Sequence, residues 1–505
     1  MKEKLKEIIQ IIFVIIFLIV NLIVLFCNIK LNTSINFLFK NYILFFTGGV
    51  VVFVGYYCFR KYRMKISENL IIGILSVLLL SFEIFVSLNA LFRSGWDVGI
   101  LYDAAYYNVF DKFPIIKFNC SKSYFEMYPN NVFFLLYEMF FAVIVKLIGR
   151  GQKTLSFLLV MNNCLIFVLA GFMLYFCVRK LTQNRKISLS AWIMYAILVG
   201  TSSWFLVPYS DSLGLLFPIF IFFVYMFYNK NAYLKTFLIS FLAFLGYQIK
   251  PQVLIVFIAI IIIKLLDIYK FDKKNVLKIF KQVFVVFLTY LLISLPIGYL
   301  KSNIMKLDEN KKIGLSHFLM MGMNTETNGV WSGEDVNFSS SFPTTSIRTQ
   351  KNLEEFEKRV QKLGIRGLAL HLRNKILINF NDGTFFFGEE GNFYVWSYPT
   401  NLKTSEFVKE FVYSNGKYYI YLATIRQSLW LIILFLMLFS CLKSKDKDVL
   451  VVQLSLIGLF LFEMLFEARS RYLFIYVPYF IILSNLGLNL LGNRLMKKYK
   501  KRGVN

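Results

Sequence analysis

The stretch IIQIIFVIIFLIVNLIVLFC, residues 8–27, carries only Gln10 and Asn21 as polar residues. A helix of about 20 apolar residues spans the roughly 30 Å hydrocarbon core of a bilayer. Inside that core a helix satisfies its own backbone polar groups. Three lysines precede the stretch, which is too long for a secretory signal and lacks a small-residue cleavage site, so we expect it to remain as a membrane anchor.

The rest of the chain repeats this pattern. Of its 505 residues 57% are hydrophobic and the mean hydropathy is +0.61, so the chain is far more apolar than the core of a soluble protein requires. We therefore predict an all-α polytopic membrane protein with a bundle of about twelve transmembrane helices. The further predicted spans are 42–59, 70–92, 155–177, 187–206, 213–228, 234–247, 253–266, 283–300, 429–442, 449–466 and 472–491.

The net charge of +27 does not indicate a nucleic-acid partner, because the basic residues form short clusters between the apolar blocks. Loops that retain Lys and Arg lie on the cytoplasmic side of a membrane. Both termini are therefore predicted to be cytoplasmic in a multi-pass protein of the cell membrane. The clusters that support this topology are 60–65, 179–186, 270–274, 443–447 and 497–502.

Residues 132–148 are apolar enough to cross the membrane, but a span here would put the later basic clusters on the outer side. We predict that they form a helix at the outer interface. Within the long segment after residue 300, Asn352 with Glu355 is typical of a helix start and Gly364 of a helix end. The predicted division is an N-terminal hairpin (1–69), a transmembrane core (70–300) with an outer loop at 93–131, an extracytoplasmic loop region (301–426), and C-terminal helices with a basic cytoplasmic tail (427–505).

Acidic residues on the predicted outer face are the candidate catalytic groups, because only 29 of 505 residues are acidic. Asp97 lies in GWDVG at 95–99, and Asp103 follows. Either carboxylate could accept a proton from a hydroxyl group, and the alternative is a solvated acid that caps a helix. Asp211 lies at a tight turn on the same predicted face, where it could instead be an N-cap.

Three cations on this face could bind an anion. Lys250 follows a short span, and a cation at membrane depth is costly enough to suggest a function, unless it snorkels to lipid headgroups. Arg469 and Arg471 lie between the last two spans, and their planar guanidinium groups suit phosphate oxygens. The structural alternative is an ion pair of Glu467 with one arginine, which would leave the other arginine without a partner.

Polar residues in three predicted outer loops complete the candidate site. Only two histidines occur in the chain, and no spacing of His, Cys or carboxylates resembles a metal site, so neither a metal nor another cofactor is predicted. The loops at 317–324 and 382–391 combine glycine with aromatic and polar groups, which suits loops that close over a ligand. The segment 128–131, of sequence YPNN, ends the first outer loop directly before the helix at 132–148. The candidate residues of these three segments are Tyr128, Asn130, Asn131, His317, Asn324, Asp382, Glu389 and Glu390.

With its acid at 97, its helix at 132–148, its second acid at 211 and its large late outer segment, the chain resembles the GT-C superfamily of membrane glycosyltransferases. The resemblance is to the bacterial branch related to protein mannosyltransferases and lipid A aminoarabinose transferases. The loops at 128–131 and 382–391 also resemble motifs of members from Gram-positive bacteria. The hairpin before residue 60 departs from these relatives, in which the catalytic loop follows the first span.

The resemblance implies transfer of a sugar from a polyprenyl-phosphate donor, with inversion, to a glycan or lipid-linked acceptor outside the cytoplasm. Asp97 would be the base, with Asp103 as its competitor for that role, and Lys250, Arg469 and Arg471 would bind the donor phosphate. The loop residues, Asp103 and Asp211 would orient donor or acceptor. Two alternatives share many of these features, a flippase or transporter of lipid-linked saccharides and a polysaccharide polymerase.

Overall fold

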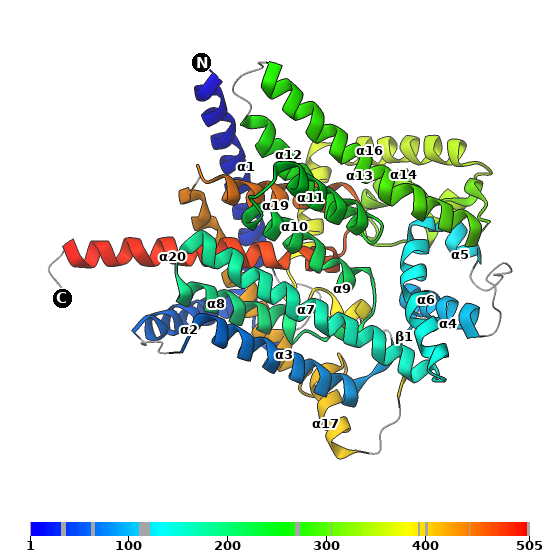
Figure 1. The fold of residues 1–505 in the computed structure, drawn as a ribbon, viewed down its shortest axis with the longest axis horizontal. Coiled ribbons are helices and arrows are strands. Elements are labelled where there is room, and N and C mark those ends of the chain that lie inside the picture. The colour runs from blue at the N-terminus through cyan, green and yellow to red at the C-terminus, as the bar shows by residue number, and fades with distance from the viewer. Residues whose placement is uncertain are drawn as a thin grey trace.

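The computed structural model describes residues 2–31, 37–61, 66–110, 122–267, 273–304, 306–391, 394–398, 402–443 and 445–501. Almost all of them are helical (Figure 1). Parts of the basic clusters at 60–65, 270–274 and 497–502 lie outside the described residues. The first half of the described chain contains α1 (Lys2–Lys30), α2 (Asn41–Lys61), α3 (Glu68–Ala90), β1 (Phe92–Ser94), α4 (Trp96–Phe110), α5 (Lys122–Met127), α6 (Val132–Leu147), α7 (Gln152–Thr182), α8 (Arg185–Tyr195), α9 (Ser210–Gly214), α10 (Leu216–Phe227), α11 (Ala232–Tyr247) and α12 (Leu254–Leu266).

The second half begins with a long helix and ends with the most deeply buried one. Its elements are α13 (Lys273–Ile304), α14 (Leu315–Gly322), α15 (Gly333–Ser340), α16 (Thr345–Phe380), β2 (Tyr394–Ser397), α17 (Lys403–Val412), α18 (Tyr419–Met437), α19 (Lys447–Leu465) and α20 (Val477–Lys501). Short 3-10 or π-helical turns that matter for the site are η3 (Ser203–Leu206), η4 (Pro251–Val253), η6 (Phe387–Gly391) and η8 (Ser470–Tyr476).

The prediction of an all-α polytopic membrane protein is confirmed. Among the described residues, ten helices are long and apolar enough to cross a membrane, and nine of them overlap predicted spans. The tenth is Pro129–Leu147, which contains α6. The predicted span 187–206 is interrupted where α8 gives way to a π-turn and η3, while α11 and α12 have only 16 and 13 residues.

Burial separates the helices that face lipid from those at the centre. Of the most apolar window in the helix Ser470–Leu495, 94% is buried, against 11% for Asn41–Lys61 and for Asn275–Ser302. The outer faces of α1, α2, α3 and α13 are lined with exposed Ile, Leu, Val and Phe side chains. Such surfaces are stable in hydrocarbon, so α20 is the central helix and α2 and α13 are peripheral.

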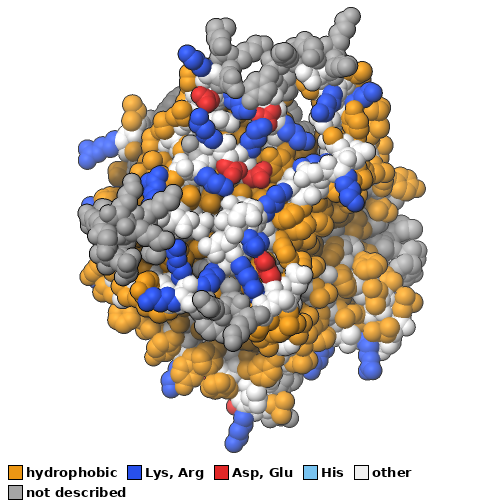
Figure 2. All heavy atoms as spheres, turned by 60° about the vertical axis from the view of Figure 1, so that its left-hand side comes forward, with side chains coloured by type: hydrophobic (Ala, Val, Ile, Leu, Met, Phe, Trp, Pro, Cys, Tyr) orange, Lys and Arg blue, Asp and Glu red, His pale blue; other side chains and the backbone are white. Residues whose placement is uncertain are grey.

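Ion pairs gather basic residues from distant parts of the sequence at one end of the bundle, the basic end. Asp267 Oδ1 lies 2.7 Å from Lys6 Nζ, and its Oδ2 lies 2.6 Å from Lys447 Nζ. Lys445 Nζ lies 2.9 Å from Glu7 Oε1. Figure 2 views the molecule from near this end and shows many Lys and Arg side chains amid apolar surface. That this end faces the cytoplasm remains a prediction.

The opposite end, the site end, carries β1, α4, α6 and η8. There β1 pairs antiparallel with β2, with Phe92 opposite Ser397 and Arg93 opposite Trp396. In Figure 1, α6 stands across the direction of α3 and α7 at this end, as a helix lying along a membrane surface would. The predicted interfacial position of α6 nevertheless remains a prediction.

The long helix α16 differs from its prediction at its start. It begins with Thr344 as its N-cap, whose side chain accepts a hydrogen bond from the Ile347 amide, so Asn352 lies inside the helix and is buried. Gly364 has non-helical backbone angles, φ 57° and ψ −177°, and separates two helical segments of α16 at a kink, so the predicted helix end at Gly364 is confirmed. Glycine allows this left-handed backbone at little cost, and the chain regains helical hydrogen bonding directly afterwards.

Candidate functional site

The turn between α19 and α20 brings the two predicted arginines to the site end. Arg471 Nη1 lies 3.1 Å from Asp211 Oδ2, and the other Asp211 oxygen accepts a hydrogen bond from Lys250 Nζ. Asp211 is fully buried, and Lys250 is 4% exposed. Lys250 therefore does not snorkel to lipid headgroups, and the Asp211 carboxylate serves an ion pair and not a helix cap.

A second carboxylate joins the two arginines. Arg471 Nε lies 2.5 Å from Glu390 Oε2, while Arg469 Nη1 pairs with Glu390 Oε1. Arg469 Nε also lies 3.1 Å from Glu467 Oε1. The expectation that one arginine would lack a partner is thus wrong, because Asp211 and Glu390 reach Arg471 from segments that the sequence could not place beside it.

Aromatic rings enclose the Arg471 guanidinium. Its Cζ lies 4.8 Å from the Trp96 ring centre, 5.1 Å from that of Tyr472 and 5.4 Å from that of Tyr209. Lys250 Nζ lies 4.7 Å from the Tyr472 ring centre. Cations held near ring faces are stabilised by the ring quadrupole, most strongly where water is excluded. These rings therefore fix the position of Arg471 in addition to its ion pairs.

Asp97 lies beside this cluster in the first turn of α4. It is partly exposed, and its Oδ2 accepts a hydrogen bond of 3.1 Å from the Tyr209 hydroxyl. The preceding Trp96 has φ 44°, an unfavourable backbone for a bulky residue, and its Nε1 donates to Ser94 Oγ at 2.8 Å. The local fold thus holds one carboxylate within reach of solvent and of the enclosed arginine.

The Tyr128–Asn131 loop meets Asp97 through tyrosines. Asn131 Nδ2 donates to the Tyr124 hydroxyl at 2.6 Å, and Asn130 Nδ2 donates to Asn131 Oδ1 at 3.0 Å. Burial and then the Asp97 charge raise the pKa of Tyr128 to about 12. Burial and then the same charge raise the pKa of the Tyr209 phenol. Both phenols therefore stay protonated near neutral pH, and the Tyr209 hydroxyl donates to Asp97.

Asp103, the competitor for the catalytic role, has a different position. It forms an ion pair with Arg93, which follows Phe92 in β1. Arg93 Cζ in turn lies 5.1 Å from the Tyr102 ring centre. The Asp103 carboxylate therefore helps to attach α4 to the strand pair, and the geometry favours Asp97 as the candidate base.

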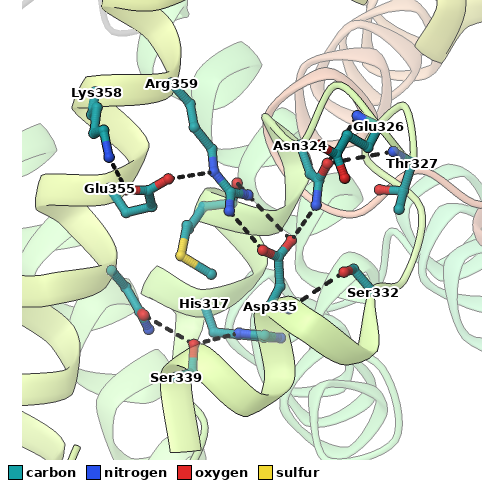
Figure 3. A network of polar contacts seen from close by, with 12 residues as sticks. His317, Asn324, Glu326, Thr327, Ser332, Asp335, Ser339, Glu355, Lys358 and Arg359 are labelled. Atoms are coloured by element: carbon teal, nitrogen blue, oxygen red, sulfur yellow. Dashed lines mark hydrogen bonds and ion pairs between the residues drawn. The ribbon is translucent and has the colours of Figure 1, made fainter. Parts of the chain in front are cut away.

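His317 and Asn324 belong to a network of their own between α14, α15 and α16 (Figure 3). His317 Nδ1 lies 2.7 Å from Ser339 Oγ, and Asn324 Nδ2 donates to Asp335 Oδ2 at 2.9 Å. Arg359 Nη2 lies 2.7 Å from Asp335 Oδ1. These contacts support the fold of the segment after α13, and neither predicted residue joins the arginine cluster.

The 382–391 loop is only partly in the site. Asp382 is buried and accepts hydrogen bonds from the Thr384 amide at 2.7 Å and the Phe386 amide at 2.6 Å. It therefore stabilises a tight turn in which Phe386 has φ 63°. Glu389 is exposed and makes no part of the cluster, whereas the next residue, Glu390, holds both arginines.

Three residues that support the site were not predicted from the sequence: Tyr209, Tyr472 and the buried Lys375. Tyr209 lies two residues before Asp211 in the same tight turn, so its position beside a predicted site residue could have identified it. Nothing in the sequence distinguishes Lys375 from the many other polar residues of α16. Its Nζ is fully buried and donates to the carbonyl oxygens of Gly322, Met464 and Phe466 at 3.0, 2.9 and 2.5 Å. It thereby fixes the end of α19 directly before Glu467.

The charges of the cluster balance. Three cations, Lys250, Arg469 and Arg471, face three carboxylates, those of Asp211, Glu390 and Glu467. Burial lowers the pKa of Arg469 to about 10, so it remains charged at neutral pH. In the part of the chain that the structure describes, no group of three or more His, Cys, Asp or Glu side chains could hold a metal ion.

Comparisons with known proteins place the chain in one family. A family model described as "Conserved hypothetical integral membrane protein" matches residues 1–490. No curated protein and no solved structure matches the sequence.

Proposed function

The chain belongs to the family of conserved hypothetical integral membrane proteins, and we propose that it is a membrane glycosyltransferase of the GT-C type. It takes a sugar from a polyprenyl-phosphate donor and transfers it, with inversion, to a glycan or lipid-linked acceptor. The site end faces the outside of the cell membrane in this proposal, and the basic end faces the cytoplasm. The acceptor is a polymer or saccharide of the cell envelope.

The observation that carries the proposal is the juxtaposition of a partly exposed carboxylate and a group of buried cations. Trp96 contacts Arg471, and Asp97 is the next residue. Transfer from a lipid phosphate needs two groups of opposite charge, one to accept a proton from the acceptor and one to stabilise the leaving phosphate. Both kinds of group meet at the site end.

The proposed reaction is a single displacement. Asp97 accepts the proton of the acceptor hydroxyl, and the hydroxyl oxygen attacks the anomeric carbon from the face opposite the phosphate. The bond between that carbon and the phosphate oxygen breaks, and the phosphate leaves with the electron pair. Arg469, Arg471 and Lys250 stabilise the charge that develops on it. Tyr209 orients Asp97 through its hydroxyl.

A carrier of lipid-linked saccharides is the second candidate, and two buried acids in apolar helices favour it. Glu83 in α3 and Glu138 in α6 are fully buried, and neither carboxylate has a hydrogen-bond partner among the described residues. Ionisable groups inside membrane segments are costly and commonly mark pathways for ions or substrates. These two acids lie outside the arginine cluster, so they leave the transferase proposal intact.

One experiment separates the two candidates. Purified protein in detergent is incubated with a polyprenyl-phosphate sugar and a mixture of cell-envelope acceptors, and the products are identified by mass spectrometry. The transferase releases free polyprenyl phosphate and a glycosylated acceptor in detergent. A carrier yields neither product there and shows activity only across a sealed vesicle. Sugars linked to lipid that co-purify with the protein identify the donor.

A further inference from the structure

Glu390 occupies the position between the two arginines. Its two carboxylate oxygens form ion pairs with different guanidinium groups, Oε1 with that of Arg469 and Oε2 with that of Arg471, the second without hydrogen-bond geometry. Glu390 is 5% exposed, and the Arg469 side chain is 15% exposed. Arginine binds carboxylate and phosphate oxygens with the same planar geometry. A phosphate with two free oxygens could therefore replace this carboxylate on the same two guanidinium groups.

Glu390 is also the carboxylate of the cluster that can leave most easily. Asp211 is completely buried between Lys250 and Arg471, and Glu467 is held by the Tyr472 hydroxyl at 2.8 Å as well as by Arg469. Glu390 lies in η6 directly after the exposed residues Gly388 and Glu389. Its side chain can turn toward solvent without unpacking the preceding part of the loop.

That preceding part is well anchored. The Phe387 ring packs against the Trp204 ring with 5.8 Å between centres, and Trp204 Nε1 donates to the Thr384 and Phe385 carbonyl oxygens at 3.2 Å each. Displacement of Glu390 therefore affects only the end of the turn. The arginines keep their other partners, Asp211 and Glu467, and remain in place to receive a ligand.

The charge balance then limits the negative charge that the ligand can carry. With Glu390 displaced, Lys250, Arg469 and Arg471 keep two ion-pair partners, Asp211 and Glu467, while Asp97 lies outside these ion pairs, so the three cations have one positive charge more than the carboxylates paired with them. A phosphodiester, which carries one negative charge, restores neutrality. A diphosphate carries more and would leave a net negative charge in a buried place, which is unfavourable.

We propose that Glu390 holds the place of the donor phosphate and is displaced by it, and that the site consequently selects a phosphodiester over a diphosphate. This inference rests on the proposed function, since it assigns the donor class of the same site. It makes Glu390 a specificity-determining residue that keeps the arginines paired while the site is empty and competes with ligands of the wrong charge.

The test measures binding, which does not depend on turnover. Purified full-length protein in detergent is titrated with decaprenyl methyl phosphate, a phosphodiester without a sugar, and with decaprenyl diphosphate. Tryptophan fluorescence reports binding, because Trp96 contacts Arg471. The wild type is expected to bind the methyl phosphate more tightly than the diphosphate. Glu390→Gln is expected to bind the methyl phosphate at least about tenfold more tightly than the wild type does, a change equivalent to about 1.4 kcal/mol.

Glu389→Gln is the matched control, because it removes the same charge from the exposed neighbouring residue, and its affinity should stay within about twofold of the wild type. Wild-type preference for the diphosphate, or no gain of affinity in Glu390→Gln, overturns the inference. The wild-type comparison decides the matter even if Glu390→Gln does not fold. If binding behaves as expected and no transfer occurs in detergent, the inference stands and the transferase proposal falls. If transfer occurs but Glu390→Gln binds the methyl phosphate no more tightly than the wild type does, the inference falls and the transferase proposal stands.

Discussion

The guanidinium carbon of Arg471 lies 4.8 Å from the centre of the Trp96 ring. This contact joins the turn before the last helix to the residue that precedes Asp97, so segments from opposite ends of the chain form one site. Tyr209 strengthens the connection, because its ring lies 4.9 Å from that of Trp96 and its hydroxyl donates to Asp97. A substitution among the arginines should therefore chiefly weaken donor binding, and a substitution of Asp97 should chiefly slow the chemical step.

Arg469→Ala should chiefly weaken binding of the lipid phosphate donor. The substitution removes one of the two guanidinium groups on Glu390, and hydrogen bonds to charged groups contribute about 1.5 to 3 kcal/mol each. Donor affinity should fall by about tenfold or more, measured by titration in detergent. Arg366→Ala is the control, since Arg366 is exposed on α16. Equal donor affinity in the wild type and Arg469→Ala would remove Arg469 from the phosphate site.

Gly99→Ala should disturb the first turn of α4 and with it the position of Asp97. A Cβ atom at residue 99 would lie 2.6 Å from the Ser94 carbonyl oxygen, too close for any contact without backbone movement. Overpacking of this kind costs about 1 to 3 kcal/mol, so both the midpoint of thermal unfolding and the transfer rate should decrease. Gly73→Ala, whose Cβ would meet nothing within 4 Å, should lower neither. An active and fully stable Gly99→Ala protein would contradict this role.

Most membrane spans could be predicted from the sequence because the apolar block is about as long as a helix that crosses the bilayer. The exceptions are informative. The block at 187–206 is apolar on average, yet the chain changes to π-helical and 3-10 geometry within it, which hydropathy does not record. Gly364 ends one helical segment as its residue type predicts, but nothing in the sequence indicates that a second helical segment follows directly after it.

The site could be predicted only in part. Residue type and predicted side of the membrane were enough to select Asp97, Asp211 and the three cations. The ion pairs among them could not be foreseen, because Lys250, Glu390 and Arg471 meet through tertiary packing. For the same reason His317 and Asn324 were selected for loop composition, while their actual partners are Ser339 and Asp335.

His317 makes stability depend on pH. Burial lowers the pKa of His317 to about 4, well below its ordinary value of about 6.5. As pH falls below 6.5 the unfolded chain takes up the proton first, so the contribution of neutral His317 is present above pH 6.5 and is lost as the pH falls to 4. The loss between pH 7 and pH 5 is about 2 kcal/mol.

Thermal unfolding of the wild type and His317→Gln at the two pH values tests this prediction. The midpoint should fall between pH 7 and pH 5 in both proteins, because other groups also titrate, but the fall should be smaller in His317→Gln. An equal fall in the two proteins would show that His317 does not contribute to the acid sensitivity.

The orientation of the bundle can be tested with single cysteines in a background where all six native cysteines are replaced by serine. Glu389→Cys reports on the site end, and Lys445→Cys, at a position 81% exposed, reports on the basic end. A maleimide that does not cross membranes should label residue 389 in intact cells and residue 445 only after permeabilisation. Labelling in the reverse order would place the site on the cytoplasmic side, where the proposed acceptor does not occur.

The most direct test is the transfer rate of Asp97→Asn with a polyprenyl-phosphate sugar in detergent, measured beside its donor affinity. The side chains of Asp and Asn have nearly the same shape, so the contact with Tyr209 and the arginine cluster should persist and donor affinity should stay within about threefold of the wild type. Loss of a general base lowers a rate by about 100-fold to 10,000-fold, and a fall in this range is the predicted result. A folded Asp97→Asn protein that transfers the sugar at the wild-type rate would contradict the assignment of Asp97 as the base.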